Sequence, residues 1–328
     1  MNLIPNEKEI QDCEIYINDK KIKFDYFYDF NKEGTYQIKY IFKTELKSTN
    51  FMFYECSALT LLDFSYFVSK NVTNMAFMLT DCSSLNELNL LKFDTSNVIN
   101  MEYLFTGCES LNALNVSKFN TKNVTDMGNM FSGCKSLLSL YLANFNTKNV
   151  KNMAYLFSFC NSLKSINLSN FDTQNVLNME CMFNNCTSLA SINISNFNTK
   201  NVVNMDYMFN NCKALKILDL SNFNTQKVVN MGCMFKNCNS LDSLDLSSFN
   251  TEKVTDMHNM FTNCYLLKKL DLSNFKTKNI TDIGEIFKNC HSLLSLDISN
   301  FNIENAENKD EMFKNCNSLN IKYYYKFK

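Results

Sequence analysis

The sequence predicts an α/β repeat solenoid, a chain wound into successive coils that each pair a short helix with a short strand. Apolar residues recur at a step of 26 residues over most of the 328-residue chain. Within one copy, their spacing first follows a helix face and then alternates as in a strand. A unit of this size cannot cover its own apolar face, whereas stacked copies bury one continuous core.

The copy that begins at Asn71 contains the predicted helix. Its apolar positions from Val72 to Leu85 are separated by three, three, one, three and three residues, which is typical of one helix face. From Asn74 onward, the residue before the first Met position of each copy is Asn or Asp. Its side-chain oxygen can accept a hydrogen bond from the amides of a first turn. We therefore expect each copy to begin with a short helix on the convex face.

The strand follows the helix in each copy. Leu88 and Leu90 are two residues apart, so they point to the same side of a strand and can be buried together. The pattern L-x-x-L-x-L and a period of roughly 20–29 residues are typical of leucine-rich repeats. The predicted fold is a leucine-rich-repeat solenoid, a right-handed β-α superhelix. Its parallel sheet lies on the concave face and its short helices lie on the convex face.

Both ends of the chain depart from the repeat. Residues 13–43 alternate apolar and polar side chains between turn signals, which predicts an antiparallel meander. We predict an N-terminal β-meander cap over residues 1–44, ten repeats over 45–304, and a capping repeat over 305–328. Caps are expected because a solenoid has to cover its open apolar ends. The alternative, an independent N-terminal binding domain, conflicts with its small size.

The repeated pattern N-M-x-x-M-F-x-x-C-x-S-L-x-x-L-x-L-S-N-F-N-T-x-N-V runs from about Glu45 to Leu319. It resembles the BspA-type leucine-rich-repeat surface proteins of bacteria and some protists. The resemblance implies a cell-surface or secreted adhesion-type binding protein without catalysis. The sequence shows no signal peptide and no apolar run of transmembrane length, so the residues alone predict a cytoplasmic protein without membrane insertion. Both locations stay open at this point.

Composition argues against several functions. The net charge is −1 and all 32 basic residues are Lys, so we expect no nucleic-acid partner, because bidentate base and phosphate recognition relies on Arg. An AT-rich genome is an alternative cause of the missing Arg. The two histidines, His258 and His291, lie more than one repeat apart, and no glycine-rich phosphate loop occurs. We therefore predict no enzyme activity, no cofactor and no metal ligands.

Most cysteines occupy one column of the repeat. The eleven members are Cys56, Cys82, Cys108, Cys134, Cys160, Cys186, Cys212, Cys238, Cys264, Cys290 and Cys316. We expect buried free thiols, because side chains that all point the same way do not converge on one ion, and because Cys packs as a small apolar residue. Disulfides between neighbouring copies and metal binding are the alternatives. Cys13, Cys181 and Cys233 lie off the column, where we expect more exposure.

The solvent-facing positions of the predicted sheet form the candidate partner-binding face. One row consists of Asn89, Asn115, Tyr141, Asn167, Asn193, Asp219, Asp245, Asp271 and Asp297. The four aspartates, ~5 Å apart, could attract Ca²⁺ or a Lys-rich partner. Alternatively, Asp replaces Asn on a solvated strand and binds nothing. Tyr141 could anchor a partner, since aromatic residues are frequent at interfaces.

These observations predict a non-catalytic, monomeric, adhesion-type protein that binds a protein or another macromolecule along its concave sheet. One alternative is an intracellular scaffold for protein–protein interactions. Another is a Ca²⁺-dependent carbohydrate or peptide binder that uses the aspartates.

Overall fold

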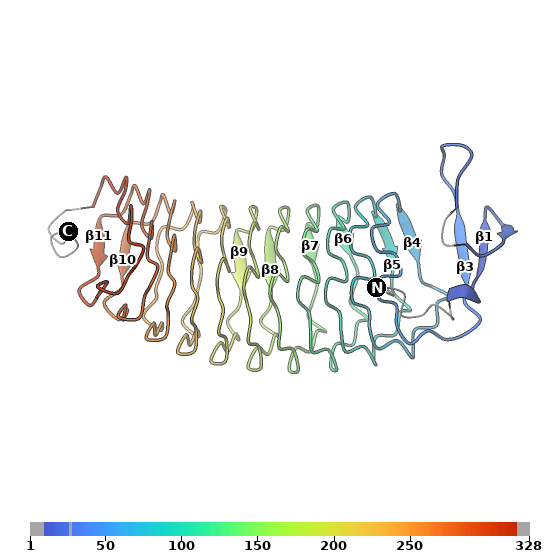
Figure 1. The fold of residues 1–328 in the computed structure, drawn as a ribbon, viewed down its shortest axis with the longest axis horizontal. Helices are drawn as coiled ribbons and strands as arrows, with labels where there is room; N and C mark the ends of the chain where they lie inside the picture. Colours follow the sequence, from blue (N-terminus) through green and yellow to red (C-terminus); the bar gives the residue numbers. More distant parts are fainter. Residues whose placement is uncertain (1–9, 26–27, 320–328) are drawn as a thin grey trace.

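In the computed structural model, which describes residues 10–25 and 28–319, the chain forms a solenoid of stacked coils (Figure 1). Isolated parallel bridges join residues 26 positions apart, from Ser48↔Asn74 to Asp282↔Asn308. Each coil therefore lies beside its sequence neighbours, with β1 and β3 at one end of the molecule and β11 at the other. The curvature and handedness of the solenoid stay predictions.

Short parallel strands confirm the predicted parallel sheet. The strands of the repeats are β4 (Leu61–Asp63), β5 (Glu87–Asn89), β6 (Ala113–Leu114), β7 (Ser139–Leu140), β8 (Ser165–Asn167), β9 (Ser191–Asn193), β10 (Lys269–Asp271) and β11 (Ser295–Asp297). They pair as β4–β5, β6–β7, β8–β9 and β10–β11. The pairing is in repeat register, as in Leu62↔Leu88. Between β9 and β10 the chain follows the same path without a named strand.

The predicted convex helices are wrong. In the described repeats, the segment that starts at Met75 is a series of turns, and its equivalents are turns as well. Phe77 and Asp81 have φ values of 58°, which an α-helix does not allow. The amides of Phe77 and Leu79 bond to carbonyls of the next coil, at 3.0 and 3.1 Å, and not to the previous helical turn. The segment therefore forms a second set of contacts between coils.

Tight turns explain why the sequence resembled a helix. The amides of Met78, Cys82 and Leu85 each bond to the carbonyl three residues earlier, at 3.0–3.2 Å. Each such turn returns an apolar side chain to the core after three residues. The spacing of three between apolar residues therefore reflects consecutive turns. Over so few residues, this spacing cannot be distinguished from the period of 3.6 residues of a helix. The Asn74 oxygen accepts the amide of Ala76 at 2.9 Å, so it stabilises a turn and caps no helix.

Positive φ values explain one set of the Asn residues. The second left-handed position of each coil is Gly at Gly107 and Gly133 and is Asn in the last six coils, from Asn185 to Asn315. Gly and Asn are the residues that adopt this conformation most readily. A Cβ at Gly107 would lie 2.1 Å from an Asp81 oxygen, so a side chain there would require the Asp81 carboxylate to move. In later coils the Asn side chains bond to one another, as from Asn263 to Asn237 at 2.6 Å.

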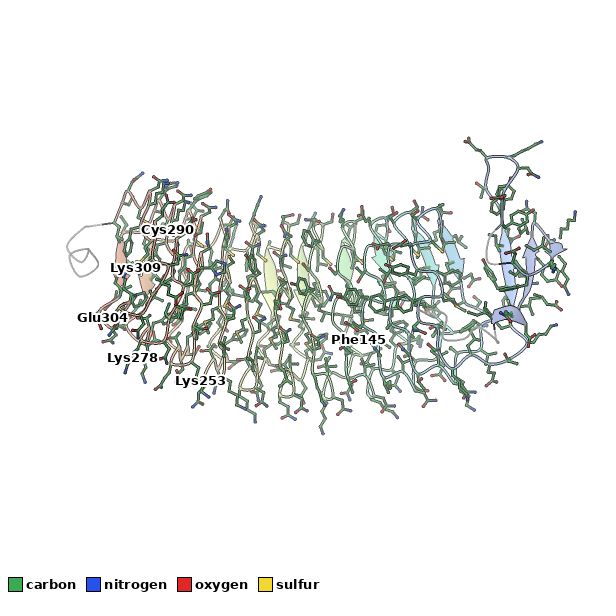
Figure 2. The ribbon with its side chains drawn as sticks, in the orientation of Figure 1. Phe145, Lys253, Lys278, Cys290, Glu304 and Lys309 are labelled. Atoms are coloured by element: carbon green, nitrogen blue, oxygen red, sulfur yellow. The ribbon has the colours of Figure 1, made fainter. Side chains whose placement is uncertain are left out.

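The core consists of columns of identical side chains. The rings of Phe157, Phe183 and Phe209 are fully buried and stack with centroids 5.5–5.6 Å apart. Buried threonines join the coils through polar bonds: the Thr199 hydroxyl donates to the Asn224 carbonyl at 2.9 Å and accepts from the Asn224 amide at 2.8 Å. Figure 2 shows Phe145 within the body of the solenoid, while Lys253 and Lys278 lie along an outer edge.

The N-terminal residues form an antiparallel sheet of the kind predicted. It contains β1 (Glu14–Ile17), β2 (Lys20–Ile22) and β3 (Ile38–Ile41) in the order β2-β1-β3. Next to β3, Phe42 contacts Phe67 of the first coils, with ring centroids 5.8 Å apart. The boundaries of cap, repeats and capping repeat stay predictions, and residues 320–328 of the last lie outside the described part. Within the described residues, no helix is long and apolar enough to cross a membrane.

Candidate functional site

The nine predicted partner-binding residues lie in one row on the sheet face. We call them the Asn/Asp row: Asn89, Asn115, Tyr141, Asn167, Asn193, Asp219, Asp245, Asp271 and Asp297. Apart from the half-buried Asn89, their side chains are exposed. Strand register places neighbours directly beside each other, as for Asp271↔Asp297. The row therefore forms one continuous surface, and its role in binding stays a prediction.

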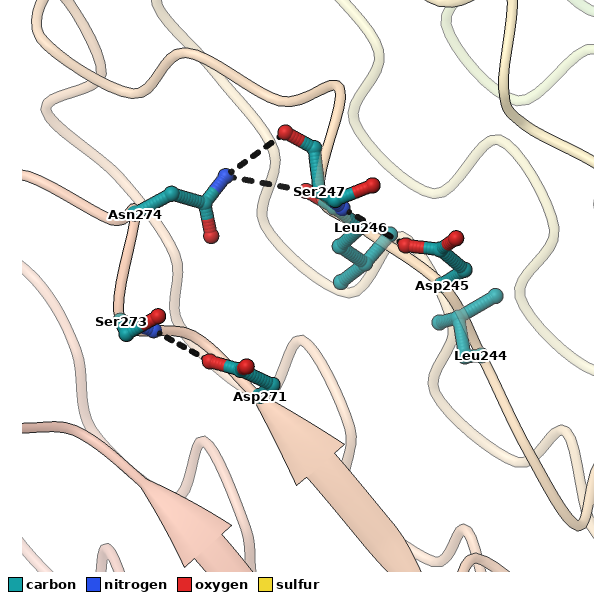
Figure 3. A pocket seen from close by; sticks show the side chains of 7 residues that line it. All are labelled: Leu244, Asp245, Leu246, Ser247, Asp271, Ser273 and Asn274. Carbon is teal, nitrogen blue, oxygen red and sulfur yellow. Dashed lines mark hydrogen bonds between the residues drawn. The ribbon is translucent and has the colours of Figure 1, made fainter.

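Most polar members of the row have a structural task. The oxygen Oδ1 of Asp245 accepts the amide of Ser247, and that of Asp271 accepts the amide of Ser273, both at 2.9 Å (Figure 3). These side chains close the turn that follows the strand. Hydrogen bonds from the serine two residues later lower the pKa of Asp219, Asp245 and Asp271. Repulsion between neighbouring aspartates acts on Asp245 in the opposite direction and is the weaker influence.

These bonds favour the simpler interpretation of the aspartates. Asn167 makes the same bond, to the amide of Ser169 at 3.0 Å, so Asn and Asp are interchangeable in this turn. A ligand is therefore not needed to explain why Asp occupies the later coils. The Ca²⁺ alternative loses its main support, although the exposed carboxylates remain accessible.

A hollow beside two of the aspartates is too small for an organic ligand. It measures about 140 Å³ and lies between Asp245 and Asp271 (Figure 3). Asn274 closes one side, where its amide nitrogen donates to the carbonyls of Leu246 at 3.0 Å and Phe249 at 2.7 Å. Ligand pockets usually measure roughly 300–1,000 Å³. The face is therefore suited to contact along its surface, with no deep pocket at this point.

Several exposed apolar side chains interrupt the polar face, among them Tyr141 and Ile217. Tyr141 is 68% exposed and Leu138, close by in the same coil, is 56% exposed. Ile217 is 80% exposed and lies two residues before Asp219. The sequence interpretation found Tyr141 and missed Ile217. Its column is Ser in several coils but also contains Leu61, Glu87 and Lys269, so the column alone gives a weak signal.

The cysteine column is buried from Cys82 to Cys316, while Cys56 in the first copy is exposed. Each buried thiol of the column donates to a backbone carbonyl 29 residues earlier, as from Cys134 to Phe105 at 3.2 Å. Burial raises the pKa of Cys134 to about 12. The expectation that Cys13, Cys181 and Cys233 are more exposed is wrong, because their exposed fractions are only 6, 5 and 1%.

A second polar cluster lies on the turn segments, away from the Asn/Asp row. Asp256, His258 and Asp282 each place a possible ligand atom within 4.8 Å of the others. The ring nitrogen Nδ1 of His258 lies 2.7 Å from Asp256 Oδ1, and Nε2 lies 3.3 Å from the Cys233 sulfur. These two contacts raise the pKa of His258 to about 10. The sequence interpretation assigned no metal ligands, because it compared only the two histidines and overlooked acids from the same and the next coil.

The parallel coils, the 26-residue register and the L-x-x-L-x-L segments define a repeat protein of the leucine-rich-repeat class. The chain belongs to the family described as "Mycoplasma protein of unknown function, DUF285", whose model matches residues 47–166, 151–269 and 237–326. No curated protein matches the chain.

Several solved structures are similar to the chain at low identity. A leucine-rich-repeat protein from Bacteroides ovatus is 18% identical, with a TM-score of 0.39, over 89% of this chain and 79% of that chain. A leucine-rich-repeat protein from Eubacterium ventriosum is 14% identical, with a TM-score of 0.26, over 81% and 78%. The functional domain of InlJ from Listeria monocytogenes, which includes a cysteine ladder, is 15% identical, with a TM-score of 0.18, over 74% and 54%.

Proposed function

We propose that this protein is a non-catalytic binding protein that holds a partner protein along the Asn/Asp row. The observation that carries the proposal is the continuous exposed face, on which the apolar side chains of Tyr141 and Ile217 stand among short polar residues. Aromatic and aliphatic anchors surrounded by polar contacts are typical of protein interfaces. We propose further that the chain acts as a monomer, in an adhesion-type role similar to that of the BspA-type surface proteins.

The dimensions of the face suit a protein partner. Eight coil steps separate Asn89 from Asp297, and a spacing of about 4.8 Å per strand gives a row about 38 Å long. A standard interface buries roughly 800 Å² on each partner, which a row of this length can supply together with its flanking columns. A nucleic-acid partner is not part of the proposal, since the chain has no Arg and no net positive charge.

The test compares two matched pairs of variants. Partner proteins are first identified by cross-linking the complete chain to proteins of the source cells and of the cells they contact, and are then purified. Tyr141→Ser and Ile217→Ser should weaken binding at least tenfold when combined. The control pair, Leu177→Ser and Val203→Ser, removes two apolar side chains that are 49 and 43% exposed on another edge of the coils. If the control pair abolished binding and the first pair did not, the partner would bind outside the row.

Two further measurements separate the alternatives. Proteolysis of intact source cells should remove a surface protein and leave an intracellular scaffold uncut. Calorimetry with Ca²⁺ tests the aspartates directly. We expect no binding, because Oδ1 of each already accepts a backbone amide and the turn explains the residue without a ligand. Binding that is lost in the combined variant Asp245→Asn and Asp271→Asn would favour the Ca²⁺-dependent function instead.

A further inference from the structure

We propose that Asp256, His258 and Asp282 bind one divalent transition-metal ion of the zinc class. One imidazole nitrogen and two carboxylate oxygens form a donor set typical of such ions. The three ligand atoms lie within 4.8 Å of one another, so small side-chain rotations would bring them around one ion. The side chains of His258 and Asp256 are 26 and 29% exposed, which leaves the ion a path from solvent.

Neighbouring coils hold the imidazole in the orientation that a metal site needs. The Nδ1 atom faces Asp256, while Nε2 lies 3.3 Å from the Cys233 sulfur. An ion that binds Nδ1 displaces the proton that this atom shares with Asp256 and releases it to solvent. Nε2 keeps its proton and donates it toward sulfur. A hydrogen bond of this kind on the second ring nitrogen orients most metal-binding histidines. Gly232 provides the space, because a Cβ there would lie 2.5 Å from Cε1 of the His258 ring.

A buried carboxylate oxygen gives independent support for a cation here. Oδ1 of Asp206 is inaccessible to solvent and has no hydrogen-bond partner. It lies 2.9 Å from the same hypothetical Cβ of Gly232, so it borders the space that the His258 ring occupies. A buried, unpaired carboxylate oxygen costs free energy. The charge of the protonated His258 ring already reduces this cost, and a divalent ion bound in place of the Nδ1 proton would reduce it further.

The turn structure does not require these ligands. At the position of Asp256, other coils have Asn152 or Asn178, whose oxygens accept the same backbone amide at 3.0 and 2.9 Å. Asp126 also occupies this column, but the equivalent of His258 in that coil is Gly128, which has no side chain to bind an ion. Two consecutive aspartates in this column are a local departure from the repeat, and a variable position supplies His258 between them. The metal site explains why these three residues occur together.

The experiment uses the complete chain and its two histidines. Titration with Zn²⁺ should show one binding equivalent, and His258→Gln or Asp282→Asn should weaken it at least tenfold. His291→Gln is the matched control, since His291 lies at a different position of the coil, where its ring donates to the Asn315 carbonyl at 2.9 Å. Circular dichroism without metal establishes that each variant is folded.

Spectra with Co²⁺ provide a test that does not depend on a variant. The chain has two histidines, so it gives two sets of imidazole proton resonances, which His291→Gln assigns. Paramagnetic Co²⁺ at one equivalent should shift or broaden the resonances of His258 and leave those of His291 unchanged. The proposal would be overturned if no ion bound, or if both histidines were affected equally. It would also be overturned by a sulfur-to-cobalt charge-transfer band, which would show that thiolates bind the ion.

Discussion

Phe183→Ala tests the buried face of the solenoid at its centre. The Phe183 ring is fully buried and stacks between Phe157 and Phe209, with centroids 5.6 and 5.5 Å away. Truncating a buried Phe to Ala costs about 3–5 kcal/mol of unfolding free energy. Each stacked pair adds about 0.5–1.5 kcal/mol beyond burial. Because two pairs are lost, we expect a value near the upper end, about 5 kcal/mol.

The substitution should also change the shape of the unfolding curve. Coils of a repeat array interact mainly with their neighbours, so a weakened central interface uncouples the two halves. Guanidinium unfolding followed by circular dichroism should then show two transitions in place of one. Phe183→Leu is the matched control, because Leu79 occupies the same column and is fully buried. It should cost about 1–1.5 kcal/mol. A loss below about 1 kcal/mol for Phe183→Ala would refute the assignment of this column to the core.

Three other predictions concern the polar and sulfur columns. In a thiol titration, the denatured chain should show all 14 thiols, whereas in the folded protein Cys56 should react first, since it is the exposed one. Rapid reaction of most thiols in the folded protein would contradict the buried column. Thr199→Val should cost about 1–3 kcal/mol in urea unfolding, because the amide and carbonyl of Asn224 lose their buried partner; an unchanged midpoint would show that water replaces the hydroxyl. Replacing Asp219, Asp245 and Asp271 by Asn should make the melting temperature less sensitive to acid. Their folded pKa values are lowered, so they stabilise the fold above the unfolded value of 3.8 and lose this effect as the pH falls further. Equal acid sensitivity of the variant would show that other groups control it.

The stacked architecture could be predicted from the sequence because identical columns force identical environments. Leu88 recurs at the strand and Cys82 in the core, and only in-register stacking buries all equivalents together. The secondary structure within a coil could not be predicted in the same way. A spacing of three fits both a helix face and a series of tight turns, and the decision depends on φ at Phe77 and Asp81. The first of these positions carries little pattern, since Phe, Tyr, Cys, Glu and Asn all occur there. The second is Gly or Asn in most coils, which is a signal for a left-handed turn that the apolar spacing outweighed.

The alignment of side chains could be predicted where they belong to one column, and could not be predicted where two coils contribute. The Asn/Asp row is one column, so its alignment followed directly from the period. The cluster around His258 combines His258 and Asp256 from one coil with Asp282 from the next coil. Its geometry depends on how far the ring leans over Gly232, which only the backbone path determines. The sequence could indicate that these residues are charged, but it could not indicate that they meet.

The repeat itself separates structural residues from functional ones. Asn211 occupies a left-handed position, Asn201 donates to the Gln174 carbonyl at 2.7 Å, and Asn193 closes a turn, so the abundant Asn is accounted for by backbone geometry. A residue that serves the fold recurs in its column, because every coil presents the same requirement. A residue that departs from its column without a packing reason therefore has to be explained by something outside the fold. Tyr141 on the sheet face meets this criterion and indicates a partner. Ile217 and His258 lie in columns that vary from coil to coil, so the partner and the ion inferred at these residues depend on exposure and on geometry.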